Sequence, residues 1–213
     1  QTCALPIYAV TPITSLSDTL LGLTEAQASK EEIRNGLQTI SSTGKGLLSF
    51  VESYRKFTRI PTPEPSLFYV KSFIERMVEL ARHQHPDVRV TFHTDIAPSD
   101  LILYADENLV SQVVINLLKN AIQAIESDKN TDKEGHINIR AYCNEAEAIL
   151  IEISNNGPAI PNDIAEHIFI PFFTTKEGGS GIGLSISRQI MRLSGGNLSL
   201  LPSKETTFIL KFN

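Results

Sequence analysis

Four short segments in the second half of the chain carry amides, lysines and glycines whose spacing suits the binding of a phosphate group and a metal ion. The first segment contains Asn116, Lys119 and Asn120. Asn116 and Asn120 are four residues apart, so on a helix both amides project from one face, beside Lys119. Amide oxygens can hold a hydrated Mg²⁺, and the lysine can face a phosphate. Taken alone, the segment is more simply interpreted as a polar helix face in solvent.

The second and third segments are ambiguous by themselves. Residues 154–161 follow a predicted strand and combine small polar residues with glycine, which lets a ligand approach the backbone closely, although the pattern also fits an ordinary turn. Residues 168–176 begin with an aromatic cluster that is typical of a hydrophobic core. The cluster is followed by Thr174, Thr175 and Lys176, which core packing does not readily explain.

The fourth segment, residues 178–184, is rich in glycine and runs into a predicted amphipathic helix. Glycines before a helix leave backbone amides free to bind phosphate oxygens, and the helix dipole favours the same ligand. The segment does not follow a strand, as a dinucleotide-binding loop would, and it lacks the Gly-Lys-Ser/Thr ending of a P-loop. One glycine run is weak evidence, whereas the four segments in this order are highly specific.

The elements that must position these segments indicate an α+β fold. Apolar periodicity predicts helices at about 70–83, 106–126 and 182–194. Asp106 is the predicted cap of the second helix. Alternation predicts strands at about 88–95, 100–104, 136–143, 147–154, 197–201 and 206–212. Strands and helices alternate loosely along the chain, and some neighbouring strands can form hairpins. This order favours a sandwich in which the helices cover one face of a sheet.

The apolar pattern in the first part of the chain predicts a helical hairpin that dimerises. Apolar residues have helical spacing over 13–54, interrupted by a polar turn around 28–30. The second helix carries a heptad pattern at Ile33, Leu37, Ile40, Gly44, Leu47, Val51 and Tyr54. A hairpin cannot cover its own apolar stripe, so we expect a homodimer that forms a four-helix bundle. The alternative is that the hairpin packs on the rest of its own chain.

Composition argues against several classes of protein. The 213 residues have a net charge of −5 and no basic run, which argues against nucleic-acid binding. No apolar run approaches the roughly 18 residues that span a bilayer, so any membrane anchor is expected upstream of this chain. Cys3 and Cys143 are the two cysteines, so no disulfide framework is expected. We expect a cytoplasmic location.

The order of the four segments resembles the ATP-binding domain of sensor histidine kinases, a branch of the ATPase group that includes gyrase, Hsp90-type chaperones and MutL. The family's Asn-box, first Gly-box, Phe-box and second Gly-box correspond to residues 116–120, 155–161, 169–173 and 179–184. Residues 171–176 together with 181–184 are similar to the nitrogen-regulatory type of kinase. The likeness extends over about 9–213, because the hairpin resembles the family's dimerisation and phosphotransfer domain.

The resemblance implies a two-layer α/β sandwich of the histidine-kinase ATPase (Bergerat) type and a protein histidine kinase activity. In this family ATP phosphorylates a histidine on the first hairpin helix, and the phosphoryl group passes to an aspartate of a response-regulator receiver domain. The implied organisation is a hairpin dimerisation domain at 8–59, a linker with three prolines at 60–65, and the ATP-binding catalytic domain at 66–213.

The resemblance also implies roles for the site residues. Asn120 would hold Mg²⁺, and Asn116 would lie near the phosphates and share the metal. Lys119 and Lys176 would face the phosphates. The implied ATP-binding set is Asn116, Lys119, Asn120, Asn155, Gly157, Ala159, Thr175, Lys176, Gly179, Gly181, Gly183 and Leu184. Hydrolysing relatives carry a glutamate at position 116 that activates water, so Asn116 disfavours a gyrase-like or chaperone-like ATPase.

Two substitutions depart from the family pattern at the adenine end of the site. The family usually has aspartate at position 155, which accepts a hydrogen bond from the adenine amino group, and this chain has Asn155. An amide oxygen can accept the same bond without charge assistance, a difference of about 1–2 kcal/mol. Ala159 replaces the second glycine of the first Gly-box and crowds the base edge. We therefore expect weakened adenine binding.

The phosphoacceptor histidine is missing from this chain. The family's hairpin opens with the pattern His-Glu-x-x-Asn-x-x-x-Pro, and Pro12 fits its proline. Counting back places the asparagine, the glutamate and the histidine at Tyr8, Leu5 and Ala4. None of the three expected residue types is present, so we expect this chain to bind ATP and not to autophosphorylate.

Residues 1–7 are interpreted as a leader that is not native. They can be encoded by CAG ACG TGT GCT CTT CCG ATC, which resembles a widely used sequencing-adapter end that finishes in one further T. A T as first base also converts an Asn codon into a codon for Tyr8. The alternative is a diverged natural N-terminus, and the chain is then a nucleotide-binding pseudokinase or a regulator-binding module without kinase activity.

Overall fold

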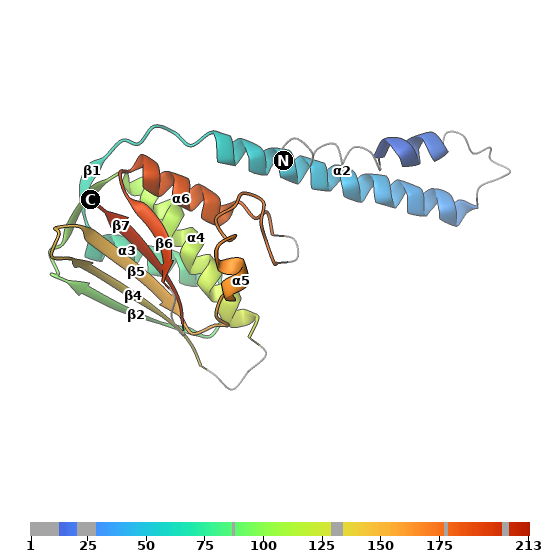
Figure 1. Ribbon diagram of the computed structural model, residues 1–213. Coiled ribbons are helices and arrows are strands. Elements are labelled where there is room, and N and C mark those ends of the chain that lie inside the picture. The colour runs from blue at the N-terminus through green and yellow to red at the C-terminus, as the bar shows by residue number, and fades with distance from the viewer. Residues whose placement is uncertain (1–12, 21–28, 87, 129–133, 177–178, 202–204) are drawn as a thin grey trace. The chain divides into compact units, whose positions relative to one another are not determined.

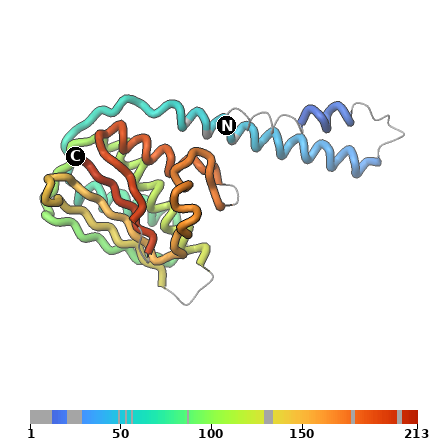
Figure 2. Tube along the Cα trace, viewed as in Figure 1, coloured from blue at the N-terminus to red at the C-terminus, as the bar shows by residue number. Residues whose placement is uncertain are grey.

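The computed structural model describes residues 13–20, 29–86, 88–128, 134–176, 179–201 and 205–213. The chain divides into two compact units, Gln1–Arg59 and Ile60–Asn213, which are described separately (Figure 1, Figure 2). The predicted leader at 1–7, with the expected histidine position at Ala4, lies outside the described residues. Among the helices that the structure describes, none has the length and apolar character needed to cross a bilayer.

The first unit contains a helical segment at 13–20 and the long helix α2, Lys30–Thr58. α2 begins at a capping box around Ser29, whose side chain accepts a hydrogen bond from the first turn of the helix. The two helices touch where Leu20 lies over Gly36, since a Cβ at position 36 would be 3.0 Å from Leu20 Cδ1. The N-terminal part is therefore helical, and two helical segments pack against each other in it.

The heptad positions of α2 form an apolar stripe along the surface of the first unit. The exposed fraction is 39% for Ile33, 56% for Leu37, 46% for Val51 and 47% for Tyr54. Side chains of this size in one contiguous row are seldom left to solvent in a stable soluble protein. The stripe is therefore a surface suited to contact with another apolar surface.

The second unit is built on a five-stranded sheet with the order β2-β4-β5-β7-β6. These strands are β2 (Val90–Ala97), β4 (Gly135–Cys143), β5 (Ile149–Asn155), β7 (Thr206–Phe212) and β6 (Asn197–Leu201). β2 pairs with β4 in parallel, and the other neighbouring strands are antiparallel. A separate antiparallel pair joins β1 (Ser66–Tyr69) to β3 (Ile102–Ala105). The centre of the main sheet thus consists of β4, β5 and β7.

Three helices cover one face of this sheet: α3 (Val70–Gln84), α4 (Glu107–Glu126) and α6 (Gly183–Leu193) (Figure 1). α4 contacts β4 and β5, α3 contacts β2, and α6 contacts β6 and β7. More buried and less buried residues alternate along β4, as expected for a sheet with one packed face. The expected two-layer α/β sandwich is confirmed.

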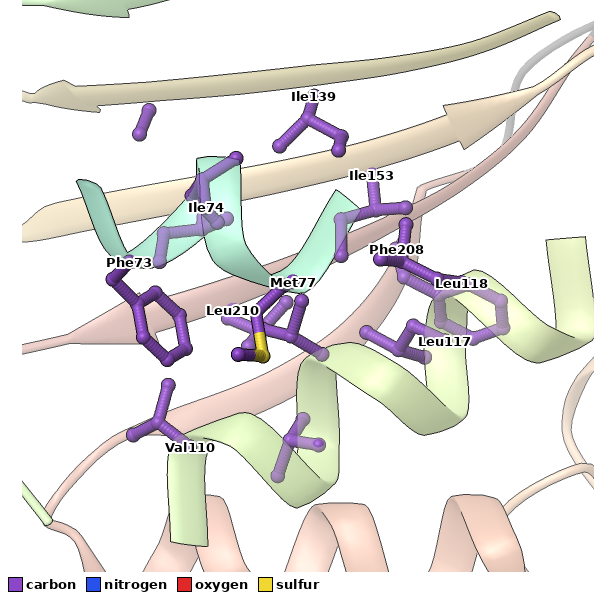
Figure 3. Close-up of a cluster of buried hydrophobic side chains, with 14 of the residues drawn as sticks. Phe73, Ile74, Met77, Val110, Leu117, Leu118, Ile139, Ile153, Phe208 and Leu210 are labelled. Atoms are coloured by element: carbon purple, nitrogen blue, oxygen red, sulfur yellow. The ribbon is translucent and has the colours of Figure 1, made fainter. Parts of the chain in front are cut away.

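The core lies between the helices and the sheet (Figure 3). Its buried side chains come from α3, from α4 and from the central strands, and include Phe73, Ile74, Met77, Val110, Leu117, Leu118, Ile139, Ile153, Phe208 and Leu210. Burial of such side chains contributes roughly 1.5–3 kcal/mol each. One face of α4 is thereby fixed in the core, and its polar residues are left on the other face.

Two short elements depart from the predicted order, and one strand begins later than predicted. β1 and α5 (Asn162–Ala165) have four residues each, too few to show a periodicity. The strand expected at 147–154 begins at Ile149. Asn144 delays it, because its Oδ1 accepts hydrogen bonds from the amides of Ala146 (3.0 Å) and Ala148 (2.9 Å) and holds a turn.

Asp106 fixes the beginning of α4, as predicted. Its Oδ1 accepts hydrogen bonds from the amides of Asn108 (2.9 Å) and Leu109 (3.1 Å), and its Oδ2 accepts one from the amide of Glu64 (2.8 Å). The bond from Glu64, followed by those from the helix, lowers the pKa of Asp106 below its ordinary value, and burial opposes this shift. One carboxylate therefore ties the segment before β1 to the start of α4.

Replacement of Asp106 by alanine is expected to lower the free energy of unfolding by about 1–2 kcal/mol at neutral pH, because the capped amides lose their acceptor. The pKa of Asp106 is lowered in the folded state, so its contribution is present above the unfolded pKa of about 3.9 and is lost as pH falls through the lower folded value. Urea unfolding at about pH 7 and about pH 3 measures both effects. Asp100→Ala, at an exposed turn position, is the control. Equal unfolding midpoints for the two variants would contradict the capping role.

Candidate functional site

One cavity of about 630 Å³ brings the predicted segments together. Its walls come from the polar face of α4, the end of β5, the start of α6 and the segments 168–176 and 179–181. The predicted residues that line it are Asn116, Lys119, Asn120, Asn155, Thr175, Lys176, Gly179, Gly181, Gly183 and Leu184. Gly157 and Ala159 are not among its lining residues.

A larger neighbouring cavity, of about 740 Å³, carries different chemistry. Ala159 lines it together with residues of α5, α6 and β6, and it shares Ile160 and Thr206 with the first cavity. Arg188 lies on its wall over the ring of Phe169, with 4.3 Å between the guanidinium carbon and the ring centroid. Among the described residues, the polar groups of the four segments converge in the smaller cavity, which is therefore the candidate site.

Asn116 lies where α4 meets α6. Its Nδ2 donates a hydrogen bond to the hydroxyl of Ser187 on α6, at 3.0 Å, and Ser187 is buried. Gly183, the first residue of α6, approaches Asn116 so closely that a Cβ at this position would overlap Asn116 Oδ1. Glycine at 183 thus allows α6 to begin against the amide of Asn116, and both residues line the cavity.

Lys176 crosses the cavity to the polar face of α4. Its Nζ donates hydrogen bonds to Gln123 Oε1 at 2.7 Å and to Asn120 Oδ1 at 3.3 Å. Partial burial and the positive charge of Lys119 lower the pKa of Lys176 below the ordinary lysine value. The two lysines therefore concentrate positive charge beside two amide oxygens, as suits an anionic ligand that brings its own cation.

Asn155 is buried at the end of β5, with an exposed fraction of 3%. Its Oδ1 accepts a hydrogen bond from the amide of Gly157 (3.1 Å), and its Nδ2 donates one to the carbonyl of Thr206 (3.4 Å). These two backbone partners determine which end of the amide is oxygen. Gly157 itself packs on the end of α4, where a Cβ would lie 2.9 Å from the carbonyl carbon of Ala124.

The aromatic segment and the glycine segment are joined by their backbones. The amide of Phe172 donates to the carbonyl of Gly181 at 2.8 Å, and the φ angles of these residues are 68° and 64°. A Cβ at Gly181 would collide with the backbone of Phe172, so glycine is required there. Positive φ is uncommon for phenylalanine, and such strained residues cluster at functional sites. The aromatic part of the segment has the predicted core role as well, since Phe169 packs edge-on against Phe208.

The donor set of the cavity fits a magnesium ion that is bound together with phosphates. Among the described residues, no group of three or more His, Cys, Asp or Glu side chains could hold a metal. The amides of Asn116 and Asn120 line one wall instead, where Asn120 Oδ1 accepts a hydrogen bond from Lys176 and Asn116 Oδ1 faces Gly183. Mg²⁺ is commonly bound by one or two protein oxygens, with phosphates and waters supplying the rest of its octahedral shell.

Two polar residues that line the cavity lie outside the four predicted segments, Gln123 and Thr206. Gln123 follows Lys119 and Asn120 by one helical turn, so helical spacing could have placed it on the same face. Thr206 begins β7, far from the four segments in sequence, and no local signal indicates it. It enters the site because β7 pairs with β5, which brings Thr206 opposite Asn155.

Comparisons with known proteins agree with this architecture. The family model of the histidine kinase-, DNA gyrase B- and HSP90-like ATPases matches residues 105–213. The nitrogen regulation protein NtrY of Azorhizobium caulinodans is 34% identical over 156 residues, which are 73% of this chain and 20% of the relative. The signal transduction histidine-protein kinase AtoS of Escherichia coli is 30% identical over 176 residues, 82% of this chain and 27% of the relative. The chain thus spans less than a third of the length of either relative.

Solved structures show the same fold. The catalytic domain of the histidine kinase ThkA has a TM-score of 0.59 and 32% identity, and the match covers 70% of this chain and 95% of that domain. The structure of ThkA in complex with the response regulator protein TrrA has a TM-score of 0.67 and 24% identity, over 99% of this chain and 60% of that chain, a likeness of fold alone. This chain therefore belongs to the histidine kinase-, DNA gyrase B- and HSP90-like ATPase family and is homologous to sensor histidine kinases.

Proposed function

We propose that this chain binds Mg-ATP in the cavity of about 630 Å³ and is the catalytic part of a sensor histidine kinase. Such a phosphotransferase phosphorylates a histidine and relays the phosphoryl group to an aspartate of a response-regulator receiver domain. The observation that carries the proposal is the convergence of Lys119, Asn120 and Lys176 on one cavity that is also lined by a glycine-rich helix start. Membership of the family supports it.

The polar face of α4 would hold the metal and the phosphates. Asn120, with Asn116, would bind Mg²⁺ through amide oxygens, and Lys119 and Lys176 would neutralise phosphate oxygens. The bound ion supplies positive charge to the phosphate oxygens as the phosphoryl group is transferred. An amide is not basic enough to take a proton from water, so Asn116 suits transfer to a positioned acceptor better than hydrolysis.

The other walls would hold the remaining parts of the nucleotide. Backbone amides at Gly181 and Gly183 would bind phosphate oxygens at the start of α6. Gly179, whose amide donates to the carbonyl of Lys176, would line the same wall. The Oδ1 of Asn155 keeps a second lone pair, beside the one that Gly157 uses, and this pair would accept the adenine amino group. The proposed set is completed by Gly157, Ala159, Thr175 and Leu184.

We further propose that the hairpin at 8–59 forms a homodimer, that 60–65 is a linker and that 66–213 is the catalytic domain, in a cytoplasmic protein. The exposed stripe of Leu37 and Val51 supports the dimer. ThkA, which shares this fold, forms a complex with a response regulator protein, and this supports a receiver domain as partner.

A second candidate function is a nucleotide-binding or regulator-binding module without kinase activity. The residue Ala4 favours it, because the resemblance places the phosphoacceptor histidine at this position. In this case the chain binds Mg-ATP and transfers no phosphoryl group from it. Residues 1–7 remain a proposed non-native leader under the first candidate function.

Calorimetric titration with a non-hydrolysable ATP analogue is expected to show Mg²⁺-dependent binding. Asn120→Ala should weaken the binding about tenfold in the presence of Mg²⁺ and little in its absence, because it removes one metal ligand. Gln112→Ala, at an exposed position of the same helix, should leave both values unchanged. No binding by the wild type at millimolar nucleotide would refute the proposed site.

Restoring the expected start of the hairpin should restore autophosphorylation. The variant Ala4→His, Leu5→Glu, Tyr8→Asn is expected to incorporate acid-labile phosphate from radiolabelled ATP, whereas the unaltered chain should not. Adding Asn120→Ala to this variant should remove most of the incorporation. If the restored variant binds ATP but stays unlabelled, the module without kinase activity becomes the better description.

Light scattering at tens of micromolar should give about twice the 23.5 kDa of one chain. Leu37→Glu should shift the mass toward the monomer, because it places a charge within the apolar stripe. Gln38→Glu adds the same charge at an exposed position outside the heptad pattern and should leave the dimer intact. A monomeric wild type with a helical hairpin would exclude the proposed dimer.

A further inference from the structure

Lys176 and a metal ion have a common binding partner in the site, the amide oxygen of Asn120. The ammonium of Lys176 donates to this oxygen at 3.3 Å and to Gln123 Oε1 at 2.7 Å. An amide oxygen has two lone pairs, so an ammonium hydrogen atom and a Mg²⁺ ion could each take one, but two cations held at one oxygen repel each other. Lys176 and the metal are therefore competing partners of Asn120.

Gln123 is the second acceptor for the ammonium of Lys176. Its contact with Lys176 is the shorter of the two, and it lies one helical turn beyond Asn120 on the same face of α4. Lys119 lines the same cavity, and its positive charge repels the ammonium of Lys176. Gln123 Oε1 is therefore the nearer of the two side-chain acceptors that hold the ammonium against this repulsion.

We propose that Gln123 is a positioning residue of the nucleotide site: it holds Lys176 on the metal-binding oxygen of Asn120, so that entry of Mg²⁺ with the nucleotide requires the release of Lys176 toward the phosphates. This inference rests on the proposed Mg-ATP binding. Gln123 then sets the affinity for the metal-bound nucleotide through its hold on Lys176. Removing its acceptor frees Lys176 and makes the metal-bound complex tighter.

The test is a double-mutant cycle on the full chain, with affinities for a non-hydrolysable ATP analogue measured by calorimetry with and without Mg²⁺. Gln123→Leu is expected to tighten binding 3- to 10-fold with Mg²⁺ and to change it less than 2-fold without. In the Lys176→Met background the same Gln123→Leu change should have no effect with Mg²⁺, because the partner of Gln123 is gone. Gln112→Leu, on the exposed part of α4, controls for the added apolar side chain.

Each result bears on one of the two proposals. Failure of the wild type to bind Mg-nucleotide refutes the proposed function itself. Binding by the wild type that Gln123→Leu leaves unchanged or weakens refutes the positioning role and leaves the nucleotide site intact. An equal effect of Gln123→Leu with and without Lys176 also refutes it, since the effect would then come from general packing. Unchanged unfolding midpoints of the variants show that these affinities refer to folded protein.

Discussion

The site depends on the division of α4 into a buried face and a polar face. Leu117 and Leu118 on α4 are buried against the sheet, which fixes the rotation of the helix about its axis. A rotation that moved Asn120 away from the cavity would expose these leucines at a cost of several kcal/mol. The positions of the amides and lysines thus follow from core packing, with Asp106 fixing the start of the helix.

The wall of the cavity that α6 provides is positioned by its contacts with α4. Asn116 binds Ser187, and the lack of a side chain at Gly183 lets α6 begin directly against α4. The start of α6 is therefore held directly against the amide of Asn116. The pairing of β5 with β7 places Asn155 beside Thr206. A helix contact, a strand pairing and one hydrophobic core are sufficient to assemble the cavity from distant segments.

Much of this could be predicted from the sequence, because the long helices and strands have clear periodicity and the four segments occur in a specific order. The four-residue elements β1 and α5 could not, since they are too short for a pattern. The sequence also could not predict which way the loop residues after β5 face. Gly157 packs on the end of α4, and Ala159 lines the neighbouring cavity. Thr206 enters the site through strand pairing, which no local pattern reveals.

The backbone bond between Phe172 and Gly181 makes the conformations of two segments cooperative. Phe172 has a φ of 68°, which a phenylalanine would leave for a more relaxed value if nothing opposed it, and the bond to Gly181 and the surrounding packing oppose it. A change in the backbone conformation of one residue alone would therefore break this bond, whereas a change in both could keep it. A spectroscopic probe on the aromatic ring of Phe172 would in this way report on the backbone of the glycine segment, although the ring and the glycine belong to different motifs.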